Sequence, residues 1–401
     1  SLSYGKKNKI KILKEIHFPH SLGLLYSAFT YYLGFKVNSG EYKLMGLAPY
    51  GKPKYIEIIK ENLIDIKDDG SFKLNMIFFN YSHGLRMTNK KFHKLFGAPP
   101  RKSESELTQK EMDIAASIQS VTEEIVIKLA KHAKKVTGSN YLCLAGGVAL
   151  NCVANGKLLR KKIFKNIWIQ PASGDAGGSL GVAYSVYYHE LGKNRKINSD
   201  GSDMMKGSFL GPKFSENQIK TCLDSLNAKY TKIDDEEILL DIVSDELIKK
   251  KIIGWHFDRM EFGPRSLGHR SIIGDPRSDQ MQSVMNKKIK YRESFRPFAP
   301  SVLSEKVKDW YELSTDSPYM LLVAKVRKDK CIKMTEAQKD LFGIEKINLP
   351  RSKIPAVTHV DYTARVQTVE KDTNSRYYKL ISKFNDKTGC PSIVNTSFNV
   401  R

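Results

Sequence analysis

The sequence predicts an α/β protein of two domains. Its 401 residues suffice for two hydrophobic cores of ordinary size. Two segments, residues 139–159 and 166–191, each read as a strand, a glycine-rich turn and a helix, which is the repeating unit of α/β folds. Periodicity is lost between residues 194 and 217, where Gly, Ser, Asn and Asp accumulate. We therefore expect one domain at 1–205 and a second at 206–401.

Helices and strands can be assigned within both regions. Residues 21–35 carry apolar groups at helical spacing, and residues 111–136 predict a long amphipathic helix with lysines near its C-terminal end. In the second region, residues 236–250 read as a helix, whereas "KIIGWHF" and "SIVNTSF" read as short strands. The alternation of helix and strand is consistent with an α/β fold in both regions.

The net charge and the cysteine spacing limit the classes to which the protein can belong. The 66 Lys and Arg residues exceed the 43 Asp and Glu residues by 23. The positive electrostatic field of such a protein attracts phosphates, nucleic acid or anionic surfaces. Much of the excess is scattered Lys, which a compositional bias also produces. Five widely spaced cysteines without a C-x-x-C pair argue against a disulfide framework or a zinc site. No apolar run reaches the roughly 18 residues of a membrane span and no signal peptide opens the chain, so we expect a cytoplasmic protein.

Glycine turns follow two of the predicted strands. Gly146 and Gly147 end the first strand, where the main chain can approach a phosphate closely; tight packing of the strand against a helix requires the same residues. Asp175 lies between glycines after the next strand, a position suited to binding Mg²⁺ or Fe²⁺ or to capping a helix. Two such turns in series are typical of an actin-like or sugar-kinase-like nucleotide lobe. A third glycine-bracketed loop, residues 37–51, holds Lys43.

Basic side chains are concentrated in two bursts, "RMEFGPRSLGHR" at 259–270 and "KIKYRESFRPFAP" at 288–300. Guanidinium groups keep their proton and suit bidentate contacts with phosphate or carboxylate, so burying them without an anion is costly. The prolines of Gly263-Pro264 and Arg296-Pro297 restrain the chain at both bursts. The alternatives are a solvated loop that pairs with Glu261, Asp275 and Glu293, or a nucleic-acid surface, for which a recurring basic stripe is expected.

Several blocks of the sequence resemble the O-carbamoyltransferase family of nodulation and antibiotic-tailoring enzymes. They include "GWHFDRMEFGPRSLGHRSIIGDPR", "NKKIKYRESFRPFAPSVL", "VDYTARVQTV" and "PSIVNTSFNVR" in the second region, and "EIHFPHSLGLLYSAFTYYLGFKVNSGEYKLMGLAPYG" and "LAGGVALNCVANGKL" in the first. The resemblance extends over nearly the whole chain. It implies an actin-like (ASKHA-type) first domain similar to tRNA threonylcarbamoyl transferases, and a YrdC-like second domain.

The same resemblance implies a reaction in two steps. The YrdC-like domain converts carbamoyl phosphate and ATP into carbamoyl-adenylate with loss of pyrophosphate and phosphate, and the actin-like domain passes the carbamoyl group to an acceptor hydroxyl. The arginine bursts would then neutralise the phosphates. By motif match, the groups for carbamoyl phosphate and nucleotide phosphates are Arg265, Lys290, Arg296, Arg365, Asn395 and Ser397.

Further residues are candidates for binding phosphate or the adenylate. Second choices for phosphate binding are Arg259, Arg270 and Arg292, whereas His269 is expected to be structural because family members often carry Asn there. The loop that receives the adenylate in the first domain matches Gly146, Gly147 and Asn151, and Lys43 joins it as a candidate.

Asp175 matches the family's metal-binding aspartate, so a divalent metal, Fe²⁺ or Mg²⁺, is expected in the first domain. The family's H-x-x-x-H block of metal ligands does not occur here, and His17 and His20 are spaced by three residues within a different motif. The first residue is Ser, and the last ones stop within an apparent strand and loop. We therefore expect a fragment that lacks the metal-histidine block and the extreme C-terminus.

Two other functions are consistent with parts of the sequence. A kinase-like ATPase of the actin-like class would hydrolyse nucleotide without a carbamoyl donor, but that fold does not require the arginine bursts. An RNA-binding protein related to tRNA modification would bind with a steep salt dependence. Only the bulk charge favours RNA, so the expected partners are carbamoyl phosphate, ATP and a hydroxyl acceptor, without nucleic acid or membrane.

Overall fold

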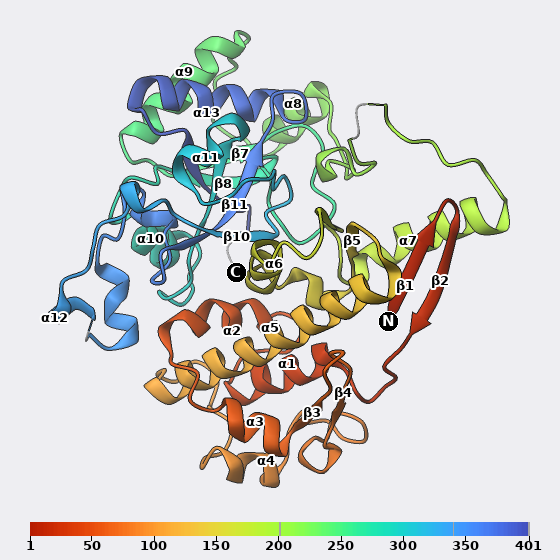
Figure 1. Ribbon diagram of the computed structural model, residues 1–401. Coiled ribbons are helices and arrows are strands. Elements are labelled where there is room, and N and C mark those ends of the chain that lie inside the picture. The colour runs from red at the N-terminus through yellow and green to blue at the C-terminus, as the bar shows by residue number, and fades with distance from the viewer. Residues whose placement is uncertain (200–201, 340, 400–401) are drawn as a thin grey trace. The chain divides into compact units, whose positions relative to one another are not determined.

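The computed structural model describes residues 1–199, 202–339 and 341–399, which fall into two compact units (Figure 1). Unit 1 comprises Ser1–Lys196 and Glu336–Ile347, and unit 2 comprises Ile197–Thr335 and Asn348–Arg401. Both units contain helices and strands, so the predicted α/β class is confirmed. The chain passes from unit 1 to unit 2 near residue 196, within the stretch 194–217 where the sequence loses its periodicity, and Glu336–Ile347 returns to unit 1.

Helices make up most of the first part of unit 1. The long helix α5 begins after a capping box formed by Thr108 and Glu111 and ends at Gly138, whose φ of 65° is left-handed. It buries Ile114, Ile118 and other apolar residues of the predicted face. The helices of this part are α1 (Leu22–Tyr32), α2 (Glu41–Leu47), α3 (Ile56–Asn62), α4 (Lys90–Leu95) and α5 (Gln109–Thr137).

The strands of unit 1 form three separate pairs. In the parallel pair, β5 (Tyr141–Leu144) leads through a turn into α6 (Cys152–Arg160), and β6 (Asn166–Ile169) leads through a second turn into α7 (Gly178–Ser185). Both predicted strand, turn and helix units are therefore present. The antiparallel pairs are β1 (Leu2–Lys6) with β2 (Lys9–Lys14), and β3 (Ile64–Ile66) with β4 (Phe72–Leu74); the returning segment adds α12 (Glu336–Lys339).

Unit 2 is organised around a six-stranded mixed sheet with the order β10-β11-β9-β12-β8-β7. Only β11 and β9 pair in parallel, and β12 lies between β8 and β9, antiparallel to both. The two predicted strands of this region correspond to β7 and β12. The strands are β7 (Ile253–His256), β8 (Arg270–Gly274), β9 (Ala299–Leu303), β10 (Leu322–Lys325), β11 (Thr363–Val369) and β12 (Ser392–Ser397).

Helix α13 packs against this sheet and against α9, so the apolar side of α13 is covered. It buries Tyr377, Leu380, Ile381 and Phe384. Toward α9, its lysines form ion pairs, among them Lys379 with Glu236 at 2.8 Å and Lys387 with Asp245 at 2.7 Å. The helices of unit 2 are α8 (Glu216–Ser225), α9 (Glu236–Ile248), α10 (Met281–Val284), α11 (Val307–Trp310) and α13 (Ser375–Thr388).

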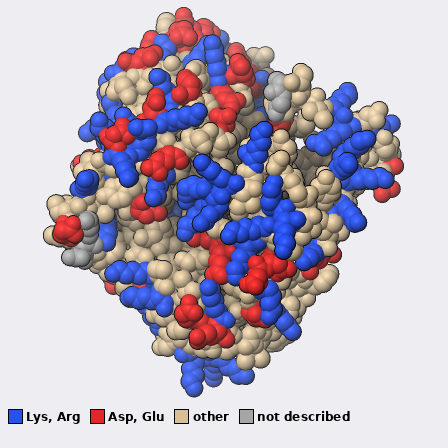
Figure 2. Space-filling view, viewed as in Figure 1, with Lys and Arg blue, Asp and Glu red and all other residues tan. Residues whose placement is uncertain are grey.

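On the face shown in Figure 2, the charged residues are distributed and are not confined to one stripe. Figure 2 shows Lys and Arg over much of the visible surface, interleaved with Asp and Glu. Within the described residues, no helix is long and apolar enough to cross a membrane.

Candidate functional site

Lys290 is the centre of the candidate site in unit 2. It follows a π-helical turn at Met285–Ile289 and is buried, with 2% of its surface exposed. Its ammonium donates to the carbonyl oxygen of Ser397 at 2.7 Å and to Oδ1 of Asn399 at 2.9 Å, and it also contacts the carbonyl oxygen of Asn399. The second basic burst is thereby joined to the end of β12, more than a hundred residues later.

The pKa of Lys290 is lowered from 10.5 to about 8. Burial of the ammonium is the largest cause, and the positive charges of Arg292 and Arg296 add to it. Three cations therefore lie close enough to repel one another. A bound anion would relieve this repulsion and stabilise the protonated lysine, so the arrangement favours a negatively charged ligand.

Asn286, which the sequence did not single out, holds the loop that carries the two arginines. Its side chain is fully buried; Oδ1 accepts from Nε of Arg292 at 2.7 Å, and Nδ2 donates to the carbonyl oxygen of Arg296 at 3.0 Å. The Arg292 guanidinium also lies 4.6 Å from the ring centre of Phe298. Arg296 lies 3.8 Å from Glu293, a long ion pair. The loop is thus fixed from inside the unit.

The buried carboxylate of Glu261 holds the main chain of the first basic burst. Oε1 of Glu261 accepts from the main-chain N–H groups of Leu267 at 2.8 Å, His269 at 3.0 Å and Arg270 at 3.2 Å. Gly268 has a φ of 106°, and a Cβ there would lie 2.4 Å from the ring of Tyr377. Glu261 is buried, so it is not the surface ion-pair partner considered from the sequence; it shapes the loop between β7 and β8.

Two of the predicted phosphate-binding arginines are engaged with main-chain carbonyls of the same region. Arg270 donates to Phe257 at 2.6 Å and to Asp258 at 2.8 Å, and Arg259 donates to Gly211 at 3.2 Å. These contacts hold the loop before β8. Arg259 and Arg270 therefore stabilise the main chain around the site. We call Lys290, Arg292 and Arg296 the cationic cluster.

The remaining predicted residues of unit 2 lie on or beside the sheet. Asn395 on β12 is buried, and its Nδ2 donates to Gln367 Oε1 at 2.9 Å and to the carbonyl oxygen of Ser266 at 3.0 Å. It therefore fixes the residue that follows Arg265. Arg365 lies on β11, and Ser397 ends β12 with its hydroxyl 3.4 Å from Lys290 Nζ.

His269 is buried as expected of a structural residue. Its ring stacks on Phe209 with ring centres 3.6 Å apart, and its Nδ1 lies 2.6 Å from the carbonyl oxygen of Arg259. Burial lowers its pKa. These contacts give the side chain a packing role.

In unit 1, the turn at Gly146 and Gly147 faces open space. Gly146 has a left-handed φ of 93°, and a Cβ at either glycine would meet no atom within 4 Å. Backbone amides at such a turn can be approached closely by a ligand. Lys43 lies on α2 with its Nζ 5.9 Å above the ring of Phe35.

Asn151 caps helix α6 and belongs to a buried polar network. Its Oδ1 accepts from the N–H of Ala154 at 3.0 Å, and its amide exchanges two hydrogen bonds with Gln119, at 3.0 and 3.1 Å. Gln119 in turn accepts from the Tyr26 hydroxyl at 2.8 Å and donates to Glu123 at 2.9 Å. The amide that the resemblance assigns to adenylate binding is therefore directed into the interior.

Asp175 is exposed at the start of a short 3-10 turn. Among the described residues, no group of three or more His, Cys, Asp or Glu side chains comes together as a metal site. His20 uses Nδ1 to accept from the N–H of Leu74 at 3.1 Å, and His17 is exposed. The residues that the structure describes do not form a complete site for Fe²⁺ or Mg²⁺.

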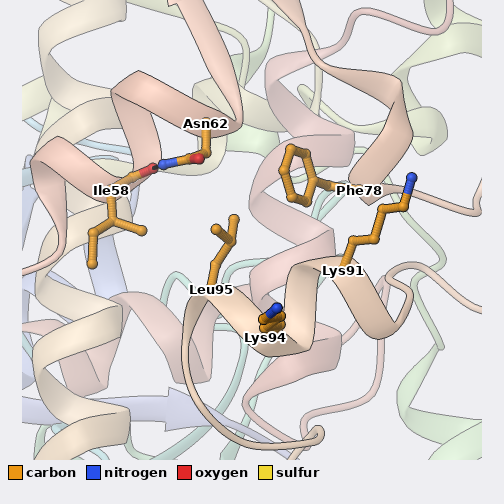
Figure 3. Close-up of a pocket in the computed structure, with 6 residues that line it drawn as sticks. All are labelled: Ile58, Asn62, Phe78, Lys91, Lys94 and Leu95. Carbon is orange, nitrogen blue, oxygen red and sulfur yellow. Dashed lines mark hydrogen bonds between the residues drawn. The ribbon is translucent and has the colours of Figure 1, made fainter.

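An open pocket of about 460 Å³ lies elsewhere in unit 1, between α3 and α4. Figure 3 shows Phe78 and Leu95 projecting into it beside Lys91 and Lys94; Ile58 and Asn62 complete its lining. None of the predicted site residues lines it. The pocket is therefore separate from the residues that the sequence assigned to phosphate and adenylate binding.

Asn399 is the functional candidate that sequence reasoning missed beside Lys290. It lies two residues after Ser397, and alternation along an extended chain gave a signal that the two side chains share one side. Its side chain contacts both Lys290 and the Ser397 hydroxyl. Asn286 had no comparable signal, because its role depends on carbonyl groups of a loop that only the fold brings near.

Two family models match separate parts of the chain. Residues 1–184 match the family model described as Carbamoyltransferase N-terminus, and residues 244–401 match Carbamoyltransferase C-terminus. The chain is 60% identical to the uncharacterized protein sll1178 of Synechocystis, covering 100% of this chain and 65% of the relative. It is 36% identical to nodulation protein NolNO of Sinorhizobium fredii (99% and 53% covered) and 35% identical to NolO of Bradyrhizobium diazoefficiens (97% and 65%). The chain thus spans between about half and two-thirds of the length of these relatives, and it belongs to the carbamoyltransferase family.

Proposed function

We propose that unit 2 forms carbamoyl-adenylate from carbamoyl phosphate and ATP, and that unit 1 passes the carbamoyl group to a hydroxyl of a small-molecule or glycan acceptor. In this proposal unit 1 is the actin-like domain and unit 2 is the YrdC-like domain. The observation that carries it is the buried Lys290 ammonium at the end of β12, with Arg292 and Arg296 near enough for their positive charges to act on it. Family membership makes a carbamoyl donor the natural source of the anion.

The atoms of the proposed reaction balance if one water takes part. Water cleaves carbamoyl phosphate into carbamate and phosphate. A carbamate oxygen then attacks the α-phosphorus of ATP, and the bond to the β-phosphate oxygen breaks to release pyrophosphate. In the second step the acceptor hydroxyl attacks the carbamoyl carbon, AMP leaves, and the hydroxyl proton passes to solvent or to a base.

The cationic cluster would lower the barrier of the first step by stabilising charge. Negative charge accumulates on the leaving pyrophosphate, and preorganised cations stabilise it best when they are held in place before the reaction. Lys290 is held by Ser397 and Asn399, and Arg292 is held by Asn286. We therefore give Arg296 direct contacts with phosphate oxygens, and Arg265, Arg365 and Ser397 supporting contacts, whereas Lys290, whose ammonium already has four protein oxygen neighbours, acts through its charge.

The proposal is tested by comparing two variants that remove one positive charge each. Arg296→Ala removes a member of the cluster, whereas Lys288→Ala removes an exposed lysine from the adjacent π-helical turn. We expect pyrophosphate release from ATP in the presence of carbamoyl phosphate to fall at least about 100-fold in Arg296→Ala, the size expected for loss of one preorganised charge. Lys288→Ala should retain the wild-type rate. Equal rates in the two variants would contradict the assignment of the cluster to phosphate binding.

A further inference from the structure

Helix α4 belongs to a segment of unit 1 that carries positive charge without acidic residues. Between Asp69 and Glu104 the sequence contains no Asp or Glu, although basic side chains occur throughout this stretch. Lys91 and Lys94 of α4 are exposed, and within the part of the chain that the structure describes neither forms an ion pair. Because they are three residues apart on one helix, their side chains lie on the same side of it. This side of α4 therefore presents two neighbouring positive charges.

The orientation of α4 is fixed from inside unit 1. Phe92 is fully buried, and its ring centre lies 5.0 Å from that of Phe96, which is buried as well. At the start of the helix, Oδ1 of Asn89 accepts from the N–H of Lys91 at 2.9 Å and from the N–H of Phe92 at 3.3 Å. Since the aromatic side chains of α4 lie in the core, the side that carries its lysines lines the pocket between α3 and α4 (Figure 3).

The rest of the pocket is mainly apolar and includes no acidic residue. Phe78 and Leu95 project into it, and Ile58 of α3 adds a third apolar side chain. The polar residue on the α3 side is the uncharged Asn62, whose Nδ2 donates to the carbonyl oxygen of Ile58 at 3.0 Å. The pocket thus combines an apolar surface with two cations on the α4 side.

The size of the pocket favours a small molecule over a second protein as its occupant. Its volume of about 460 Å³ lies in the range of small-molecule pockets. A stable interface between proteins takes about 800 Å² from each partner, which an area the size of this pocket does not supply. The ligand must also suit the charge of the lining, which is positive and has no compensating carboxylate.

From this arrangement we infer that the pocket binds a soluble phosphate monoester with an aliphatic or aromatic body. The body would lie against Ile58, Phe78 and Leu95. The head group would lie between Lys91 and Lys94. A phosphate monoester carries about two negative charges near neutral pH and matches the two ammonium groups, whereas a carboxylate carries one. This site lies in unit 1 and does not rest on the proposed function.

The test compares three probes that share one body and differ in the charge of the head group: octyl phosphate, octanoate and 1-octanol. Titration calorimetry of the wild-type chain, with each probe kept below its micelle concentration, should give the highest affinity for octyl phosphate and the lowest for octanol. Raising KCl from about 20 to about 500 mM should weaken binding of octyl phosphate, because salt screens exposed charges. Binding of octanol should not weaken.

Two double variants that remove two lysines each assign the binding to α4. In Lys91→Gln with Lys94→Gln, the affinity for octyl phosphate should fall about tenfold, the size expected for two exposed charge pairs, and its salt dependence should disappear. The matched control is Lys131→Gln with Lys135→Gln, which removes two exposed lysines from α5, outside the pocket. It should bind every probe as the wild type does.

Leu95→Asn tests the apolar part of the pocket. This change should weaken octyl phosphate and octanol together, because both lose the same apolar contact, and it should preserve the salt dependence of octyl phosphate binding. Circular dichroism of each variant confirms that it is folded before binding is compared.

Four outcomes would overturn the inference. Equal affinities of the two double variants for octyl phosphate would show that Lys91 and Lys94 do not hold the head group. Octanoate bound as tightly as octyl phosphate would contradict a phosphate monoester, and octyl phosphate bound no more tightly than octanol would contradict an anionic ligand altogether. Self-association of the wild type that Leu95→Asn abolishes in sedimentation, without binding of octyl phosphate, would assign this face to a second copy of the chain.

Discussion

Lys290 combines burial, four oxygen neighbours and two nearby guanidinium groups. Motif reasoning identified it as a phosphate-binding residue, yet the sequence did not indicate that its ammonium is desolvated and has a lowered pKa. The shift has a consequence for stability. Since the pKa of Lys290 is about 8 in the folded protein and 10.5 unperturbed, the unfolded chain binds more protons between these values. The contribution of this group to the free energy of unfolding therefore rises with pH across that window.

The same pKa predicts how nucleotide binding depends on pH. Binding that uses the protonated Lys290 should weaken as the pH rises above about 8, measured as the dissociation constant of ATP by calorimetry. In Lys290→Arg the guanidinium keeps its proton to above about pH 12, so this variant should show little change between about pH 7 and 9.5. A parallel loss of affinity in both proteins would show that another group titrates.

At the scale of elements, the loop between β7 and β8 depends on one carboxylate. Glu261 accepts three main-chain hydrogen bonds, from Leu267, His269 and Arg270. Glu261→Ala would leave buried N–H groups without their acceptor, so we expect a loss of about 2–4 kcal/mol in the free energy of unfolding. Urea unfolding measures it, and Glu312→Ala, which removes an exposed carboxylate from unit 2, should change the urea midpoint little. Equal midpoints for the two variants would contradict the role given to Glu261.

Local elements were easier to predict than their pairing. The predicted helix at 111–136 corresponds to α5 at Gln109–Thr137, because its apolar period and terminal lysines are local signals. The strands β7 and β12 were also foreseen. The order of the sheet was not, since β12 pairs with β8 and β9 across about a hundred residues and no local pattern specifies such partners. The loop geometry around Glu261 was missed for the same reason.

At the candidate site, too, the sequence predicted which residues matter but not which contacts they make. The two basic bursts pointed to an anion, and within the second one Arg292 and Arg296 lie near enough to Lys290 for their positive charges to lower its pKa. It places Arg259 and Arg270 on main-chain carbonyls instead, and it turns the amides of Asn395 and Asn151 inward. A motif match selects residues that matter at a site, but only the contacts separate those that reach a ligand from those that hold the site in shape.

At the scale of the whole molecule, family membership rests on both units, because separate family models match residues 1–184 and 244–401. The excess charge of 23 does not by itself indicate a partner, since Lys and Arg are interleaved with Asp and Glu over the visible surface (Figure 2). We propose that specific recognition of the ligand uses the cluster around Lys290 and not the overall positive charge. Unit 1 contributes an open glycine turn, which we propose as the place where the adenylate is received.

The central claim is that carbon from carbamoyl phosphate becomes attached to AMP. Wild-type protein incubated with ATP and carbamoyl phosphate labelled at carbon should yield a labelled nucleotide with the mass of carbamoyl-adenylate, detected by mass spectrometry after rapid quenching, together with pyrophosphate. Omission of carbamoyl phosphate should abolish both products. ADP and phosphate formed equally with or without the donor, and no label on any nucleotide, would contradict the account and indicate an ATPase.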